Sequence, residues 1–259
     1  MNAFVDKYQV EKQFSRAASS YDAAAIVQKK MSDQLIQYVD EHLKNKPVSA
    51  ITDLGCGTGL SLYKLSKKYP KATYTAVDIS KAMLEKTSTL LPGINLIHAD
   101  MEEYLPNTHQ DLIFSNASIQ WCDFEEVLEK VRRSLKANGI LAFSSFGPLT
   151  HIELAKSWQA VDGHEHRINF MDIQEHTDKL KEAGFTVLER KSETHQLNFE
   201  NTADLLSSIK QTGATNAAKN RVRGLLGKER YERFIQELNK IKPLILSYET
   251  LSFLAQKKQ

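Results

Sequence analysis

Apolar positions recur along this chain at two spacings, one typical of helices and one typical of strands. Residues 5–45 carry apolar side chains at helical spacing, with an interruption at Ser19 and Ser20, and the pattern predicts that a longer helix begins at Tyr21–Asp22. Thereafter, short apolar runs alternate with helical segments. The runs predicted to be strands are "VSAITDL", "ATYTAVD", "INLIHAD", which ends on Asp100, "QDLIFSNASIQW", whose strand ends near Asn116, and "ILAFSSFG".

The segments between these strands begin and end as helices do. Ser80 is placed to cap the helix "SKAMLEKTSTLL", and Gly139 is placed to end the helix "FEEVLEKVRRSL" in a left-handed conformation. Strands that alternate with helices form βαβ units. We therefore predict an α/β fold with a Rossmann-like, mostly parallel sheet and helices on both faces.

The alternation breaks after Gly147. Helices are expected within 149–183 and 201–242, with strands at "FTVLERKSETHQLNF" and "LSYETLSFLA". We expect a single domain in which 48–147 forms a ligand-binding core. Residues 1–45 would form a helical lid, and the two later helical blocks would cap the carboxyl ends of the strands and shape a substrate pocket. The lid is expected to move, because a buried reaction centre must open to admit its substrate.

Composition excludes several classes of protein. The chain has 259 residues, a net charge of +2 and two cysteines, Cys56 and Cys122, so a disulfide framework is excluded. No segment approaches the roughly 20 apolar residues that span a bilayer, and the first residues lack the apolar centre of a signal peptide. We expect a soluble, cytoplasmic protein with no membrane partner.

The segment "ITDLGCGTGL" (51–60) indicates a backbone that wraps closely around a ligand. A dinucleotide site requires Gly-x-Gly-x-x-Gly, but the third glycine here, Gly59, comes one position early. Asp53 precedes the glycines, and a carboxylate at that place would repel a pyrophosphate. S-adenosylmethionine carries an ammonium and a sulfonium group and no phosphate, so an acid beside the turn favours it.

Acids also end the next two predicted strands. Asp78 is placed to accept hydrogen bonds from both ribose hydroxyls, and Asp100 with Met101 to bind the amino group and ring of adenine. Each acid by itself is more simply explained as a helix cap or a solvated strand end. The three together, behind the glycine turn, predict S-adenosylmethionine as the cofactor.

At this point the chain can be compared with a known family. Residues 48–255 resemble the class I S-adenosylmethionine-dependent methyltransferases, in which a last, antiparallel strand lies between the fifth and sixth, as "LSYETLSFLA" would. Four segments resemble the malonyl-[acyl-carrier protein] O-methyltransferase family of biotin synthesis (BioC). They are "FSRAASSYDAAAIVQ" (14–28), "SNASIQWCDF" (115–124), "LTHIELAKSWQAVDGHEHRINF" (149–170) and "LLSSIKQTGATN" (205–216).

The resemblance implies methylation of the free carboxylate of malonyl-acyl carrier protein, which gives the methyl ester primer for pimeloyl and biotin synthesis. A carboxylate with a pKa of about 4 is ionised at pH 7, so no general base is expected. The protein should orient the substrate and exclude water. The candidates for orienting the substrate are Tyr21, His166 and Arg167, although a core aromatic residue and a solvated loop explain them almost as well.

The cofactor site expected on this basis combines the turn, the strand ends and the N-terminal helices. Phe14 and Trp121 could shield the sulfonium from water, since an aromatic face also favours a cation, and Asn116 and Ala117 should pass the methionine part. The full expected set is Phe14, Arg16, Tyr21, Gln28, Asp53, Gly55, Cys56, Gly57, Asp78, Ile79, Met83, Asp100, Met101, Glu102, Asn116, Ala117 and Trp121. The histidines of "HEH" at 164–166 do not have zinc-ligand spacing, so no metal is expected.

An acidic acyl carrier protein requires a basic docking surface. The expected surface consists of Lys219, Arg221, Arg223, Lys228, Arg230 and Arg233. A solvated helical face is the competing explanation. Nucleic acid is not expected as a partner, because the segment lacks the interleaved aromatic residues that stack on bases.

Two other functions compete with this one. A carboxyl methyltransferase for a small free diacid such as aconitate would share the cofactor site but would not need the basic segment. A protein that binds the cofactor without turnover would tolerate gaps in the cofactor site, whereas every expected position in this chain is filled.

Overall fold

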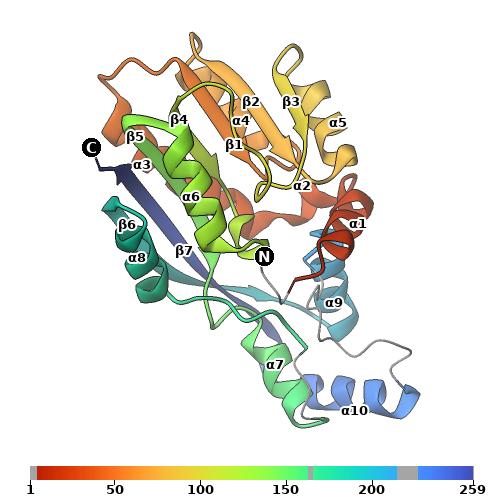
Figure 1. Ribbon diagram of the computed structural model, residues 1–259. Coiled ribbons are helices and arrows are strands. Elements are labelled where there is room, and N and C mark those ends of the chain that lie inside the picture. The colour runs from red at the N-terminus through yellow and green to blue at the C-terminus, as the bar shows by residue number, and fades with distance from the viewer. Residues whose placement is uncertain (1–4, 163–165, 215–226, 259) are drawn as a thin grey trace.

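The computed structural model describes residues 5–162, 166–214 and 227–258, which form a mixed sheet flanked by helices (Figure 1). The sheet order is β3-β2-β1-β4-β5-β7-β6, and β7 runs antiparallel to both of its neighbours while the other pairs are parallel. This confirms the predicted fold class and the inserted last strand. The strands are β1 (Ala50–Leu54), β2 (Thr73–Asp78), β3 (Asn95–His98), β4 (Gln110–Ser115), β5 (Leu135–Phe146), β6 (Phe185–Asn198) and β7 (Ile245–Lys257).

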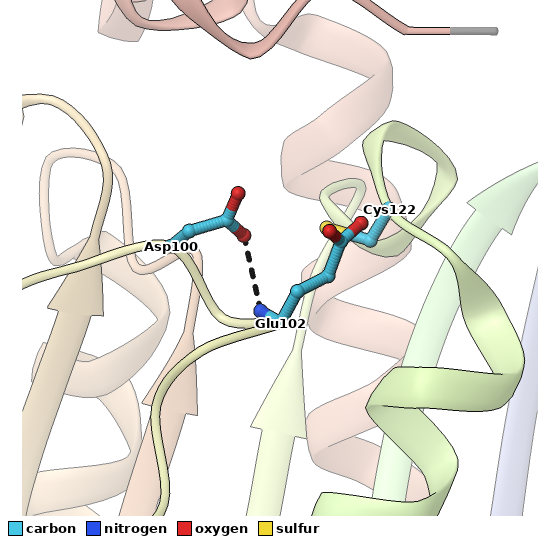
Figure 2. A group of neighbouring side chains, drawn as sticks. All are labelled: Asp100, Glu102 and Cys122. Atoms are coloured by element: carbon cyan, nitrogen blue, oxygen red, sulfur yellow. Dashed lines mark hydrogen bonds between the residues drawn. The ribbon is translucent and has the colours of Figure 1, made fainter. Parts of the chain in front are cut away.

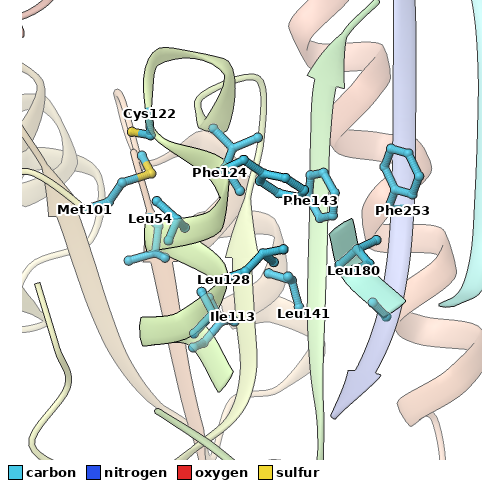
Figure 3. Close-up of a cluster of buried hydrophobic side chains, with 14 of the residues drawn as sticks. Leu54, Met101, Ile113, Cys122, Phe124, Leu128, Leu141, Phe143, Leu180 and Phe253 are labelled. Atoms are coloured by element: carbon cyan, nitrogen blue, oxygen red, sulfur yellow. The ribbon is translucent and has the colours of Figure 1, made fainter. Parts of the chain in front are cut away.

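Helices cover both faces of the sheet through two buried apolar clusters. One face is covered by α3 (Ile26–Leu43), α4 (Leu60–Lys68) and α5 (Lys81–Leu90). The other is covered by α6 (Phe124–Ser134) and α8 (Ile173–Glu182). Figure 3 shows the second cluster, in which the rings of Phe143 and Phe253 stack at 4.8 Å across β5 and β7. Burial on both faces explains why the central strands are almost continuously apolar.

The remaining helices lie toward the carboxyl ends of β1 and β4 (Figure 1). They come from three distant parts of the chain and pack on one another and on the start of β7. These helices are α1 (Lys7–Ala17), α2 (Tyr21–Ala24), α7 (Ile152–Gln159), α9 (Thr202–Gln211) and α10 (Lys228–Asn239), with the short 3-10 helix η1 (Ile119–Trp121) beside them. In an open α/β sheet this end is where ligands bind.

The N-terminal helices differ from the sequence-based prediction. The helix that begins at Tyr21 lasts for a single turn, because Ala25 has a ψ of 51° and leaves the helical conformation. The long helix therefore begins at Ile26. No proline or glycine marks this break, so apolar spacing could not reveal it.

One strand boundary and one left-handed position also differ from the prediction, whereas one helix cap is confirmed. β3 ends at His98, before Asp100. Asn138, with a φ of 62°, adopts the left-handed conformation that was expected of Gly139. The Ser80 hydroxyl does cap α5, since it accepts a hydrogen bond from the amide of Met83 at 3.3 Å.

None of the helices within the described ranges has both the length and the apolar character needed to cross a membrane.

Candidate active site

The glycine turn joins β1 to α4 at the carboxyl end of the sheet. Gly55, Gly57 and Gly59 have φ values of +72°, +56° and +83°, a region that other residues rarely adopt. A Cβ on Gly55 would lie 1.9 Å from the Ser118 hydroxyl oxygen. The turn therefore requires glycine at this point, both for its backbone conformation and for its close contact with the segment after β4.

Asp53, just before the turn, is a buried acid that lacks a partner. Its residue exposure is 1 %, and neither carboxylate oxygen has a hydrogen-bond partner within the described part of the chain. Burial, and then the nearby charge of Asp78, raises the pKa of Asp53 to about 8. A buried acid that lines a hollow beside a glycine turn fits a ligand with an ammonium group, such as S-adenosylmethionine.

Asp78, at the end of β2, fixes the turn as well as facing the cavity. One carboxylate oxygen accepts a hydrogen bond from the amide of Gly57, and the other accepts one from the amide of Ser80, both at 2.8 Å. Burial raises the pKa of Asp78 to about 6, although these two bonds oppose the shift. Lone pairs that remain on this carboxylate can accept hydrogen bonds from ribose hydroxyls.

Asp100 belongs to a cluster with Glu102 and Cys122 (Figure 2), a group of residue types that can hold a metal ion. However, the ammonium group of Lys7 already contacts all three side chains. Its nitrogen lies 2.9 Å from an Asp100 oxygen, 2.9 Å from a Glu102 oxygen and 3.2 Å from the Cys122 sulfur. The cation from α1 therefore balances the two carboxylates.

The first of three adjoining cavities lies among these groups and has an empty volume of about 590 Å³. Twelve of the residues predicted to bind the cofactor line it: Phe14, Tyr21, Gly55, Gly57, Asp78, Ile79, Met83, Asp100, Met101, Asn116, Ala117 and Trp121. Gln28, Asp53 and Cys56 line the adjoining second cavity, which shares Tyr21 and Asn116 with the first. The structure therefore brings most of the predicted set together around two adjoining cavities.

Arg16 and Glu102 are the two predicted residues that line neither hollow. Arg16 is exposed at the end of α1. Glu102 is buried, and its carboxylate accepts a hydrogen bond from the amide of Asp123 at 2.6 Å in addition to its contact with Lys7. Tyr21, predicted to orient the substrate, faces both cofactor-side cavities and not the third cavity.

The third cavity is larger, with an empty volume of about 1400 Å³, and its wall is mostly apolar and aromatic. It meets the first cavity at Trp121 and the second at Gln28. The indole nitrogen of Trp121 is buried and has no hydrogen-bond partner in the described ranges, and the ring packs edge-on against Phe14 at 5.8 Å. Trp121 therefore lies at the boundary between the first and the third cavity.

Arg167 supplies a half-buried cation to the third cavity. One terminal guanidinium nitrogen donates hydrogen bonds to the carbonyl oxygens of Pro148 and Thr150, both at 2.7 Å. No carboxylate pairs with this guanidinium among the residues that the structure describes, and burial lowers its pKa. A cation in such a position fits an anionic group of a ligand.

His166 also lines the third cavity, but its polar contacts are made within the protein. Its ring stacks on Trp158 at 3.9 Å, and Nε2 lies 2.8 Å from an Asp162 oxygen. Arg230 of α10 lies 3.0 Å from the other oxygen of Asp162. His166 therefore helps to hold α7 and α10 together around the cavity.

Three residues at the site were missed from the sequence. Lys7 contacts acids far along the chain, and nothing in the N-terminal pattern indicated that contact. His151 and Tyr248 line the third cavity with ring centroids 4.7 Å apart. His151 falls inside one of the segments that resemble the methyltransferase family, which was the one signal available.

Comparisons with known proteins agree with this geometry. A family model described as a methyltransferase domain matches residues 51–139. A malonyl-[acyl-carrier protein] O-methyltransferase of Nitrosospira multiformis is 31% identical, over 90% of this chain and 82% of that protein. A protein of the same name from Methylovorus sp. is 34% identical, over 89% of this chain and 83% of that protein.

Solved structures show the same fold at low sequence identity. The YcgJ protein of Bacillus subtilis has a TM-score of 0.60 at 14% identity, over 88% of this chain and 99% of that one. The N-methyltransferase NodS of Bradyrhizobium japonicum, in complex with S-adenosylhomocysteine, has a TM-score of 0.51 at 13% identity, over 88% and 87%. The chain belongs to the malonyl-[acyl-carrier protein] O-methyltransferase family, within the class I S-adenosylmethionine-dependent methyltransferases.

Proposed function

We propose that this protein transfers the methyl group of S-adenosylmethionine to the free carboxylate of malonyl-acyl carrier protein and so forms the methyl ester used in biotin synthesis. The observation that carries the proposal is the arrangement of acidic and basic side chains across the adjoining cavities. Among the described residues, the buried acid Asp53 lines the second cavity without a hydrogen-bond partner, and Arg167 lines the third cavity without a carboxylate partner. The relatives named for this reaction support the choice of substrate.

On the cofactor side, the acids bind the cationic and hydroxyl groups. Asp53 pairs with the ammonium group of the methionine part, Asp78 accepts from the ribose hydroxyls, and Asp100 accepts from the adenine amino group. When bound, the cofactor supplies a methyl carbon activated by positive sulfur. The aromatic faces of Phe14 and Trp121 keep water away from that charge.

On the substrate side, the residues orient a carboxylate that is already ionised. Arg167 holds the oxygen that does not react, and the apolar wall around Trp158 and Phe234, whose rings stack at 4.1 Å, excludes water. No residue has to accept a proton from the substrate at neutral pH. His166, which contacts Asp162 and stacks on Trp158, supports this wall and does not serve as an acid or a base.

The helical additions act as the lid and cap of one domain. Among the described residues, polar contacts between the core and α1 or α2 include those of Lys7, the 2.8 Å contact between the hydroxyls of Ser15 and Ser80, and the hydrogen bond that Thr58 donates to Asp22 at 2.7 Å. Contacts of this kind can open and close repeatedly, so these helices form a lid that moves. The cap consists of α7, α9 and α10.

Carrier protein docks on the basic surface that includes α10. Lys228 and Arg233 are exposed there, whereas Arg230 is partly committed to Asp162. Lys219, Arg221 and Arg223, which were predicted as part of the surface, lie outside the described residues. Tyr231 of α10 is 46% exposed and lines the third cavity, so the docking face adjoins an entrance for the acyl group.

Identification of the product tests the proposal directly. The full chain is incubated with methyl-labelled S-adenosylmethionine and malonyl-acyl carrier protein, and the carrier protein is analysed by mass spectrometry before and after mild alkali. We expect one methyl group on the malonyl part, released by alkali as methanol. Label on the carrier polypeptide, or no label with a cofactor that binds normally, would contradict the proposal.

A further inference from the structure

We infer that His151 hydrogen-bonds the acyl carbonyl oxygen of the substrate through Nε2, and so selects a malonyl thioester over a carboxylic acid that lacks this carbonyl. The inference rests on the proposed function, because it concerns the substrate of the same site. His151 lies outside the residues expected to orient the substrate. With this hydrogen bond, the site would recognise the thioester carbonyl in addition to the carboxylate.

The backbone holds His151 in an unusual conformation. Its φ is +56°, a left-handed value that costs free energy for any residue with a side chain. Its amide donates to the carbonyl of Ser247 at 2.7 Å, and the preceding Thr150 exchanges two hydrogen bonds with the backbone of Glu249. The loop before α7 is therefore fastened to the start of β7 (Figure 1), and the ring has a fixed direction.

The ring is placed in the cavity but lacks a partner there. Nε2 is buried without a hydrogen-bond partner in the described part of the chain, and the ring packs edge-on against Tyr248 at 4.7 Å. Both residues line the third cavity with Arg167. A buried nitrogen held in a strained loop and left without a partner is a group that a ligand can satisfy.

The charge state of His151 fits a neutral acceptor. Burial, and then the nearby charge of Arg167, lowers the pKa of His151 to about 4, so its ring is neutral at pH 7. A neutral imidazole can donate one hydrogen bond to a carbonyl and adds no second charge to the cavity. Among the described lining residues, Lys210 is the other lysine or arginine besides Arg167, and it is exposed, which leaves the half-buried Arg167 as the cation for one carboxylate.

The covalent structure of a malonyl thioester matches this pair. One methylene separates its carboxylate from its carbonyl carbon, so a donor next to the carboxylate-binding cation is well placed for the carbonyl oxygen. Arg167 and His151 are such neighbours, since the guanidinium donates to the carbonyl of Thr150, the residue before His151. A free diacid would have to bury a second carboxylate beside a neutral ring, which is costly.

The test compares two substrates that differ only at the carbonyl. They are the malonyl thioester of the carrier protein and its carboxyethyl thioether, in which a methylene replaces the carbonyl. The variants are His151→Phe, which keeps a ring against Tyr248, and His151→Asn, which tolerates the left-handed conformation and keeps a shorter donor. His195→Phe, on β6 away from the cavity, is the matched control.

For His151→Phe we expect kcat/KM on the malonyl thioester to fall by about tenfold, with the thioether changed by less than about twofold, because the lost hydrogen bond exists for one substrate alone. His151→Asn should retain part of the preference. Parallel loss on both substrates, or no loss on the thioester, would overturn the inference. Cofactor affinity measured on each variant shows that the fold is intact.

Failure of the proposed function would look different. If the wild-type protein does not methylate the malonyl thioester, the proposed function is wrong and the inference falls with it. If the wild type methylates it and the His151 variants lose activity equally on both substrates, the inference alone is wrong.

Discussion

The two sides of the site differ in charge and in how the chain builds them. The cofactor side carries acids at the ends of successive strands: Asp53 has no hydrogen-bond partner in the described part of the chain, and Asp78 fixes the turn. The substrate side carries the half-buried cation Arg167, which has no carboxylate partner among the described residues, in a wall of aromatic residues from α7, α10 and β7. Each side thus presents the charge opposite to its proposed ligand. Binding, and not the stability of the empty protein, therefore explains why neither Asp53 nor Arg167 has a partner of opposite charge among the described residues.

The largest expected effect is that of Asp53→Asn. Cofactor affinity should fall by on the order of 1000-fold, because the variant removes the partner of a buried ammonium group. The empty variant should nevertheless be more stable at pH 7, by about 2 kcal/mol in the free energy of unfolding. Calorimetric titration of the cofactor and denaturant unfolding of the empty protein measure the two effects.

The sign of the pH dependence follows from the raised pKa of Asp53. In the folded protein this carboxyl keeps its proton up to about pH 8, whereas in the unfolded chain it releases it near the ordinary value of 3.8. Its stabilising contribution is therefore complete below pH 3.8 and is lost as the pH rises through 8. The stability gain of Asp53→Asn should shrink toward pH 4. A gain that is independent of pH would contradict this reading.

Asp111→Asn is the matched control for the replacement of a carboxyl group by an amide. Asp111 lies at the opposite end of β4, where it accepts hydrogen bonds from the amides of Ser49 and Ala50 and pairs with Lys136 at 2.8 Å. This variant should lower the free energy of unfolding by about 1 kcal/mol and leave cofactor affinity unchanged. We thus expect cofactor affinity to depend on Asp53 and not on Asp111, although both acids lie in the same sheet.

The next effect is expected on the substrate side alone. Arg167→Met should lower kcat/KM by about 100-fold, because the substrate carboxylate would be buried without its cation. Cofactor affinity should stay within about twofold of wild type. Steady-state kinetics and cofactor titration measure the two quantities. Arg190→Met is the control, since Arg190 donates to Gln174 and Thr177 on the flank of the sheet.

A smaller effect is expected where α1 joins the cofactor side. Lys7→Met leaves the carboxylates of Asp100 and Glu102 without their shared cation, so α1 should detach more easily and cofactor affinity should fall by about tenfold. Limited proteolysis should cut the N-terminal helices faster in this variant. Lys12→Met is a control on the same helix, where Lys12 lies over the ring of Tyr8. Equal proteolysis of the two variants would contradict the role given to Lys7.

The smallest effect concerns docking. Reversal of charge in Lys228→Glu with Arg233→Glu should raise KM for malonyl-acyl carrier protein by about fivefold at low salt and leave KM for malonyl-coenzyme A unchanged. The difference should shrink at high salt, since exposed charges are screened. Arg133→Glu with Lys181→Glu, exposed on α6 and α8, is the matched control. An equal rise of KM in both double variants would place docking elsewhere.

The sequence predicted the lining of the first two cavities better than that of the third, for a physical reason. Asp53, the glycines and Asp78 lie at consecutive strand ends, and parallel strands bring such residues to one edge of the sheet without further information. The fold class was predicted for the same reason, from the alternation of strands and helices. Lys7 was missed because its partner Asp100 is 93 positions away, and only tertiary packing joins them.

The substrate side depends almost entirely on such distant contacts. Arg167 was chosen from its place in a recognised segment, but the sequence did not show that the guanidinium would face a cavity without a carboxylate partner. His151 meets Tyr248 only because the loop after β5 is fastened to β7. The break at Ala25 likewise has no mark in the apolar spacing.

The most direct test of the central claim is a methyl-transfer assay with three acceptors side by side: malonyl-acyl carrier protein, malonyl-coenzyme A and aconitate, each at low and high salt. The account predicts that the carrier protein is the preferred acceptor and that salt weakens this preference. Turnover confined to aconitate would leave the cofactor side as described and contradict the proposed reaction.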